Sequence, residues 1–149
     1  MDFYKILMEK GKKEGIEKNI VGGVIFNSNN EVLIISRNKD DFMGGIDELP
    51  SGNMEIGETI PQSLDREIKE ETNLDIESIE SYITSFDYLS GSGKKSRQYN
   101  FLLNVKSTED VKLTEHDNFK WMSLEDAITK ANITEEVRFV LECVKFNLK

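Results

Sequence analysis

Cysteine and histidine are nearly absent from this sequence of 149 residues, which holds one of each, Cys143 and His116. A single cysteine cannot form a disulfide within the chain, and it excludes a zinc site built from several cysteines. The position of Cys143 in an apolar helical pattern predicts a small buried side chain rather than a nucleophile. His116 stands between two acids in a polar stretch, where a solvated histidine is more common than a ligand.

Long apolar runs are also missing. No stretch approaches the roughly 18 apolar residues of a membrane-spanning helix, so we expect no membrane segment. The first residues lack both the basic start and the apolar run of a secretory signal peptide. We therefore expect a cytoplasmic protein that has no membrane partner.

The composition predicts a soluble globular protein. Hydrophobic residues make up 38% of the chain and charged residues 32%, whereas a disordered chain would carry fewer apolar residues. The length suits a single domain, which we place at residues 18–149. In the N-terminal segment, residues 1–17, Phe3, Ile6 and Leu7 are spaced as on one face of a short helix. Both a monomer and a homodimer are compatible with these features.

Basic residues are scarce in the middle of the chain. The formal net charge is −9, and residues 47–80 hold eleven acids against only two bases, Arg66 and Lys69. That segment therefore accounts for the whole net charge. An acidic centre argues against a nucleic-acid polymer as partner, because it cannot neutralise phosphates. It remains compatible with a small phosphorylated ligand that arrives with divalent cations.

Three glutamates in this acidic segment indicate a metal site. Glu67, Glu70 and Glu71 are spaced i, i+3 and i+4, so on a helix their carboxylates share a face. Like charges at this spacing repel each other by roughly 0.2–0.5 kcal/mol per pair. A bound cation would remove the repulsion, and carboxylate oxygens favour Mg²⁺, Mn²⁺ or Ca²⁺ over zinc.

The helix that carries these glutamates can be bounded from its residues. Thr59 suits the N-cap position, because its side-chain oxygen can accept from the first turn. Ile60, Leu64 and Ile68 repeat every four residues and form a stripe that faces the core. Asn73 follows the last turn, where asparagine is the second choice after glycine for a left-handed residue.

Strands and helices alternate around this helix, which predicts a mixed α/β or α+β fold. Residues 20–26 and 32–36 are β-rich and flank a turn at residues 27–30, so we expect them to pair as a hairpin. Residues 76–89 and 97–105 flank a glycine-rich loop and predict a second hairpin. The other predicted elements are a strand at residues 46–49, polar loops at 37–45 and 106–118, a strand at 119–122, and helices that begin at Ser123 and Thr134.

The central stretch resembles a known family motif. Residues 52–74 follow the pattern G-x5-E-x7-R-E-U-x-E-E-x-G-U of the Nudix box, in which U is aliphatic. Residues 48–52 and 121–127 resemble two further segments of that family, so the chain is identified as a member of the Nudix hydrolases, similar to MutT-like members. Asn73 stands where the family has glycine, and because asparagine tolerates the same backbone conformation we expect only a minor loss of helix-end stability. The matching residues are Gly52, Glu58, Arg66, Glu67, Ile68, Glu70, Glu71 and Leu74.

The resemblance implies both a fold and an activity. The Nudix fold is an α/β/α sandwich around a mixed sheet, in which the box forms a loop, a helix and a second loop. The implied activity is hydrolysis of a nucleoside diphosphate linked to another group, with Mg²⁺, or Mn²⁺ in its place, as the cofactor. By the same resemblance the metal ligands are Gly52, Glu67, Glu70 and Glu71, and the catalytic pair that ties the helix to the loop is Arg66 and Glu58.

The sequence does not decide which carboxylate takes the proton from the attacking water. Family members often carry a loop glutamate about six residues before the conserved tryptophan, and Glu115 has that position here. Glu67 itself and Asp117 are the alternatives.

Candidate substrate contacts lie outside the box. A phenylalanine beside a tyrosine offers a ring for base stacking, and two amide side chains on the partner strand could read a base edge. Two glycines in the first strand could let a ligand approach the backbone. Packing within the sheet is the alternative explanation for each. The candidates are Gly23, Arg37, Phe86, Gln98 and Asn100.

We expect the substrate to be a small phosphorylated nucleotide, with a nucleoside triphosphate as the first choice. ADP-ribose and nucleotide sugars are alternatives, although the downstream proline typical of ADP-ribose cleavage is absent, since only Pro50 and Pro61 occur. Tyr88 falls slightly early for the tyrosine that would indicate dinucleoside polyphosphates. A regulatory domain on the same fold without catalysis is disfavoured, because every acid of the box is intact.

Overall fold

The computed structural model of the chain describes residues 2–37, 45–114 and 116–147. Within this part of the chain, no helix is long and apolar enough to cross a membrane. Strands and helices alternate as the sequence predicts. In chain order the elements are α1 (Phe3–Lys13), β1 (Lys18–Ile25), β2 (Glu31–Arg37), β3 (Asp47–Glu48), β4 (Ser51–Asn53), α2 (Ile60–Thr72), β5 (Ile76–Leu89), β6 (Lys95–Val105), β7 (His116–Ser123), α3 (Leu124–Thr129) and α4 (Glu135–Asn147).

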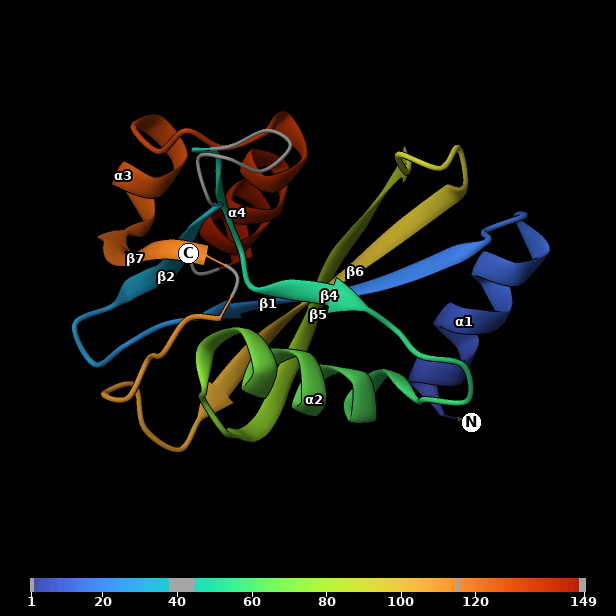
Figure 1. The fold of residues 1–149 in the computed structure, drawn as a ribbon, viewed down its shortest axis with the longest axis horizontal. Helices are drawn as coiled ribbons and strands as arrows, with labels where there is room; N and C mark the ends of the chain where they lie inside the picture. Colours follow the sequence, from blue (N-terminus) through green and yellow to red (C-terminus); the bar gives the residue numbers. More distant parts are fainter. Residues whose placement is uncertain (1, 38–44, 115, 148–149) are drawn as a thin grey trace.

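The strands form two sheets (Figure 1). The larger sheet has the order β4-β1-β6-β5, in which β1 and β6 are parallel and the other neighbours are antiparallel. The smaller sheet has the order β3-β2-β7 and is antiparallel. Because β1 and β2 follow each other in the chain, the turn between them connects one sheet to the other.

The predicted hairpin of residues 20–26 and 32–36 is wrong. Among the described residues, the isolated β-bridge between the two segments joins Phe26 and Val32. Both edges of β1 are occupied, by β4 and β6, and both edges of β2 are occupied, by β3 and β7. A strand has only two hydrogen-bonding edges, so partners from distant parts of the chain replace the local pairing. The second predicted hairpin, β5 with β6, is confirmed.

Helix α2 lies on one side of the strands, and α3 and α4 lie on the other (Figure 1). An apolar cluster packs each of these two groups of helices against the strands. In β1, Val21 and Ile25 belong to the cluster that contains α2, whereas Val24 belongs to the cluster that contains α3 and α4. Leu33 and Ile34 of β2 divide in the same way, because successive side chains of a strand point to opposite faces. With helices packed on both sides, the predicted α/β/α sandwich is confirmed.

Local signals set both ends of α2. The Thr59 side chain accepts from the backbone N–H of Gln62, and the Gln62 side chain accepts from the N–H of Thr59, which completes a capping box. Asn73 follows the helix in the left-handed conformation, with a φ of 68°. Its Nδ2 donates to the carbonyl oxygen of Asp110 at 3.1 Å, which ties the helix end to the segment before β7.

The N-terminal segment packs on the domain. Gly11 of α1 is buried, and a side chain there would collide with the hydroxyl of Tyr99 on β6. Lys95 donates through Nζ to the carbonyl oxygen of Glu14 at 2.8 Å. The helix runs from Phe3 to Lys13. The predicted helix is therefore present and is attached to the β5–β6 hairpin.

Two strands, β7 and β4, differ from the prediction, and both contribute residues to a cavity. The strand predicted at residues 119–122 already begins at His116, inside the predicted polar loop. The short strand β4 was not predicted, since its Gly52 gives it little intrinsic strand preference. These two segments bring His116 and Gly52 to the side of the molecule on which α2 carries its acids.

Candidate active site

A cavity of about 960 Å³ lies among residues of both sheets and of α2. Two chemically different groups of residues share its lining, and Arg37 lines it as well. The first group, called the acidic wall below, consists of Glu48, Gly52, Glu67, Glu71 and His116. The second group, called the aromatic wall, consists of Phe86, Tyr88 and Gln98.

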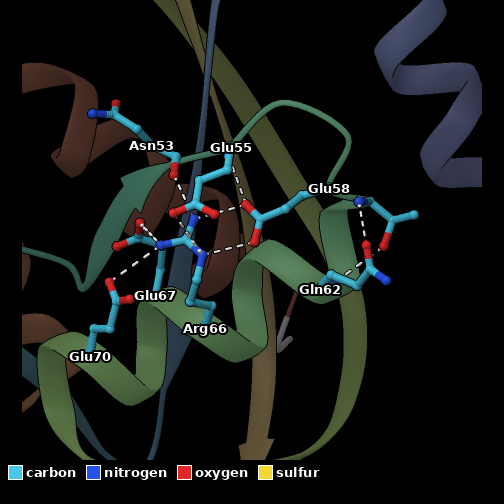
Figure 2. Close-up of polar contacts among 8 residues, drawn as sticks. Asn53, Glu55, Glu58, Gln62, Arg66, Glu67 and Glu70 are labelled. Atoms are coloured by element: carbon cyan, nitrogen blue, oxygen red, sulfur yellow. Dashed lines mark hydrogen bonds and ion pairs between the residues drawn. The ribbon is translucent and has the colours of Figure 1, made fainter.

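Arg66 links the acids of α2 to the preceding loop (Figure 2). Its Nε and Nη2 donate to the two oxygens of Glu58, each at 2.8 Å. Its Nη1 donates to Glu67 at 2.7 Å and to Glu70 at 3.3 Å. Nη2 also donates to the carbonyl oxygen of Asn53 in β4 at 2.9 Å. A bidentate arginine–carboxylate pair has a defined geometry, so the pair with Glu58 fixes the orientation of Arg66. The contact with Asn53 then ties α2 to β4.

The same contacts set the ionisation of the cluster. Hydrogen bonds from Arg66 lower the pKa of Glu58 to about 2, and Glu58 in turn raises the pKa of Arg66. Burial raises the pKa of Glu67, and the hydrogen bond from Arg66 offsets this only in part. The folded protein therefore favours the charged form of Glu58 and disfavours that of Glu67.

Gly52 leaves room for the carboxylate of Glu67. A Cβ at position 52 would overlap the carboxyl group of Glu67, so any other residue would displace it. The side chain of Glu67 is only 12% exposed. The glycine of the motif thus allows a carboxylate to lie directly against the backbone of β4 at the cavity.

The structure corrects the prediction for His116, which is not a solvated loop residue. Its side chain is 8% exposed, and its Nε2 lies 2.8 Å from Oε2 of Glu48. Its Nδ1 lies 3.6 Å from Oε2 of Glu71. Glu48 also accepts through Oε1 from Nη2 of Arg37 at 2.8 Å. A continuous series of contacts therefore runs from β2 through β3 and β7 to α2.

Sequence patterns could not identify the pairing of Glu48 with His116. Phe119 and Trp121 of β7 pack in the cluster of α2, and strict alternation would turn residue 116 away from that helix. A register shift opposite Ser36 and Arg37 breaks the alternation and directs the ring toward Glu71. A bulge of this kind leaves no trace in a period-two pattern.

The donor atoms of the predicted ligands, one carbonyl oxygen and three carboxylates, fit a hard divalent cation. Among the described residues, no group of three or more His, Cys, Asp or Glu side chains is arranged to hold a metal ion. Glu70 stands apart, since its side chain is 57% exposed and is paired with Arg66. Gly52, Glu67 and Glu71 share the acidic wall. Their carbonyl and carboxylate oxygens are the donors that Mg²⁺ and Mn²⁺ take.

Gln98 and Asn100 form a buried pair of amides on β6. Gln98 donates through Nε2 to Oδ1 of Asn100 at 2.8 Å, and Asn100 donates through Nδ2 to the carbonyl oxygens of Thr84 and Gln98. Gly22 of β1 provides the space, because a Cβ there would lie 2.6 Å from both Oδ1 and Nε2 of the pair. Only Gln98 reaches the cavity lining, so Asn100 is placed to orient it.

The remaining substrate candidates divide into two groups. Arg37 and Phe86 line the cavity. Gly23 does not, because the space above its Cα is filled by Leu103 and Ile68, which would lie 2.5 and 3.1 Å from a Cβ. The glycine at position 23 therefore serves the close packing of β1 against β6 and α2.

The general base stays a prediction among three carboxylates. Glu115 lies outside the described residues, as does the side chain of Asp117. Glu67 lies on the acidic wall.

Comparisons with known proteins identify relatives of this chain. The family model of the NUDIX domain matches residues 17–142. Over 89 residues the chain is 35% identical to the asymmetrical bis(5'-nucleosyl)-tetraphosphatase of Caenorhabditis elegans, a match that covers 58% of this chain and 64% of that protein. Over 58 residues it is 41% identical to the 8-oxo-dGTP diphosphatase of Proteus vulgaris, covering 39% of this chain and 52% of that protein. The matched segments thus span only between half and two thirds of these two relatives.

A solved structure shows the same fold. The MutT protein from Methanosarcina mazei Go1 superposes with a TM-score of 0.75 at 24% sequence identity, covering 91% of this chain and 99% of that one. The family match spans most of the chain and includes the whole of residues 52–74, which carry Glu58, Arg66 and the glutamates of α2. The chain therefore belongs to the NUDIX domain family.

Proposed function

We propose that the protein hydrolyses a phosphoanhydride bond of a nucleotide with the help of a divalent cation, Mg²⁺ or Mn²⁺. The observation that carries this proposal is the lining of one cavity by two complementary walls. The acidic wall offers oxygen donors for a cation that can accompany phosphates. The aromatic wall offers rings and an amide for a base.

The residues of the acidic wall have separate parts in this reaction. Glu67, Glu71 and the Gly52 carbonyl would hold the cation, while Arg66 orients Glu67 from outside the cavity lining. When bound, a divalent cation neutralises charge on the phosphates and polarises the phosphorus–oxygen bonds. Water attacks phosphorus, a carboxylate takes its proton, and the other phosphate group leaves with the electron pair of the broken bond. The proton acceptor is Glu67, Glu115 or Asp117.

The aromatic wall is built to hold a flat, polar ring. Phe86 and Gln98 are direct neighbours across β5 and β6, and the rings of Phe86 and Tyr88 lie 6.1 Å apart. Nε2 of Gln98 uses one of its two N–H groups to donate to Asn100, so the side-chain oxygen and the second N–H group remain for a ligand. A base stacked on Phe86 would donate an N–H to that oxygen.

A nucleoside triphosphate, intact or oxidised, is the first substrate we propose. The similarity to the Proteus vulgaris protein named 8-oxo-dGTP diphosphatase supports it. The products would be a nucleoside monophosphate and pyrophosphate.

A dinucleoside polyphosphate is the second candidate. The 35% identity to the Caenorhabditis elegans tetraphosphatase favours it. Tyr88 also favours it, since this residue lines the cavity and remains 36% exposed, which leaves its ring accessible to a second base.

A substrate panel tests the proposal. Purified protein would be incubated with the common nucleoside triphosphates, 8-oxo-dGTP, diadenosine tetraphosphate and ADP-ribose, each with Mg²⁺, with Mn²⁺ and with EDTA, and the products separated by chromatography. We expect cation-dependent cleavage of triphosphates, with diadenosine tetraphosphate as the main competitor. The variant Glu67→Gln, prepared in parallel, controls for contaminating hydrolases. Nucleotide binding without any cleavage would instead identify a non-catalytic domain.

A further inference from the structure

The ring of His116 lies between two carboxylates that belong to different elements. Nε2 is 2.8 Å from Glu48 of β3, and Nδ1 is 3.6 Å from Glu71 of α2. Among the described residues, Nδ1 is a buried ring nitrogen that makes no hydrogen bond. Leaving such a polar atom buried without a partner is unfavourable for the folded state. The carboxylate of Glu71 lies 3.6 Å from this nitrogen, slightly too far for a hydrogen bond.

Both carboxylate oxygens of Glu48 make contacts, and one of these contacts holds the ring of His116. One oxygen accepts from Arg37 and the other contacts His116. The Glu48 side chain is 20% exposed, so it is shielded from most of the solvent that could compete for these contacts. With Nε2 in contact with Glu48, Nδ1 is directed at Glu71.

We propose that His116 is a positioning residue that holds the Glu71 carboxylate in place for cation binding, and that Glu48 fixes the ring for this purpose. The inference rests on the proposed function, because Glu71 is a metal ligand only within it. Groups behind a metal ligand set its orientation, and their loss typically lowers metal affinity by about 10–100-fold.

Two amide substitutions separate this role from simple packing. An asparagine at position 116 places its Nδ2 close to the position of the histidine Nδ1, whereas a glutamine places its Nε2 close to that of the histidine Nε2. His116→Asn therefore retains the group that faces Glu71, and His116→Gln retains the group that faces Glu48. If His116 only fills space, the two variants should bind a cation with equal affinity.

The experiment is a titration of the protein with Mn²⁺ alone, followed by electron paramagnetic resonance of the free ion, which requires no substrate. We expect His116→Gln to bind Mn²⁺ about tenfold more weakly than wild type, and His116→Asn to stay within about threefold. Asp65→Asn, which removes an exposed acid of the same helix, serves as the control and should bind as wild type does. Thermal unfolding of each variant confirms that it is folded.

A double-mutant cycle tests the part of Glu48. Glu48→Gln should weaken Mn²⁺ binding in wild type and add little in the His116→Gln background, because both changes release the same ring. Equal Mn²⁺ affinity of wild type, His116→Asn and His116→Gln would overturn the inference and leave the proposed function intact. A wild-type protein that binds no Mn²⁺ would overturn the proposed function and the inference with it.

Discussion

The guanidinium of Arg66 holds both oxygens of Glu58 at 2.8 Å and one oxygen of Glu67 at 2.7 Å. One side chain thus connects the loop before α2 to an acid of the cavity (Figure 2). Glu67 lies on the acidic wall because this arginine and Gly52 together define its position.

Arg66→Lys should damage both stability and turnover. Lysine keeps the positive charge but lacks the planar fork that binds two oxygens at once. We expect the free energy of unfolding to fall by about 1–3 kcal/mol, the cost of lost hydrogen bonds to charged groups, and kcat to fall with it. Urea unfolding and steady-state kinetics measure the two effects. Lys69→Arg, on the same helix, should change neither quantity.

Glu58 should make the free energy of unfolding depend on pH. Its pKa is lowered from 4.5 to about 2 in the folded protein, so the unfolded chain binds the proton more readily. The stabilisation is complete above about pH 4.5 and is lost as the pH falls toward 2. The difference in unfolding free energy between wild type and Glu58→Gln should therefore be large at pH 7 and shrink below pH 4.5. A difference that stays constant down to pH 3 would contradict this assignment.

We predict that Asn73 replaces the glycine of the family motif without a net loss of stability, because its side-chain hydrogen bond offsets the strain of its backbone. It is left-handed, with a φ of 68°, and its amide donates to Asp110. Asn73→Gly relaxes the backbone but loses that hydrogen bond, so we expect a change within about 0.5 kcal/mol. Asn73→Ala loses the bond and strains the backbone, which should cost about 1–2 kcal/mol. Equal destabilisation of the two variants, measured by urea unfolding, would refute the account.

Gly22 and Gly23 should respond differently to alanine. A Cβ at position 22 lies 2.6 Å from the polar atoms of Gln98 and Asn100. Gly22→Ala should therefore disturb the aromatic wall and raise KM about tenfold with little change in kcat. At position 23 the Cβ meets the apolar Leu103, so Gly23→Ala should lower stability by about 1–3 kcal/mol and leave KM of the folded enzyme unchanged. Steady-state kinetics and thermal unfolding of both variants distinguish the two sites.

Features encoded locally could be predicted from the sequence. Thr59, the apolar stripe and Asn73 lie within one helix and its caps, so the bounds of α2 followed from neighbouring residues. The spacing of the acids also predicted a shared face. It did not predict that Glu70 would pair with Arg66, four residues before it, and lie outside the cavity lining.

Features that depend on distant pairing could not be predicted. The partners of β1 and β2 come from four other strands, and nothing in the turn between them indicates that both edges will be taken. Glu48 and His116 are 68 residues apart in sequence, and a register shift in β7 brings them together. Gly22 and Gly23 look alike in sequence, yet one borders an amide pair and the other borders the core.

The central claim is that the partly buried carboxylates of Glu67 and Glu71 on α2 hold a divalent cation for phosphoanhydride hydrolysis. The most direct measurement is the Mg²⁺-dependent turnover of Glu67→Gln and Glu71→Gln on the best substrate of the panel, with Asp65→Asn as the charge-matched control. We predict that each glutamine variant loses at least about 100-fold in kcat, while its melting temperature stays near that of wild type and Asp65→Asn remains active. Wild-type turnover in both glutamine variants would contradict the account.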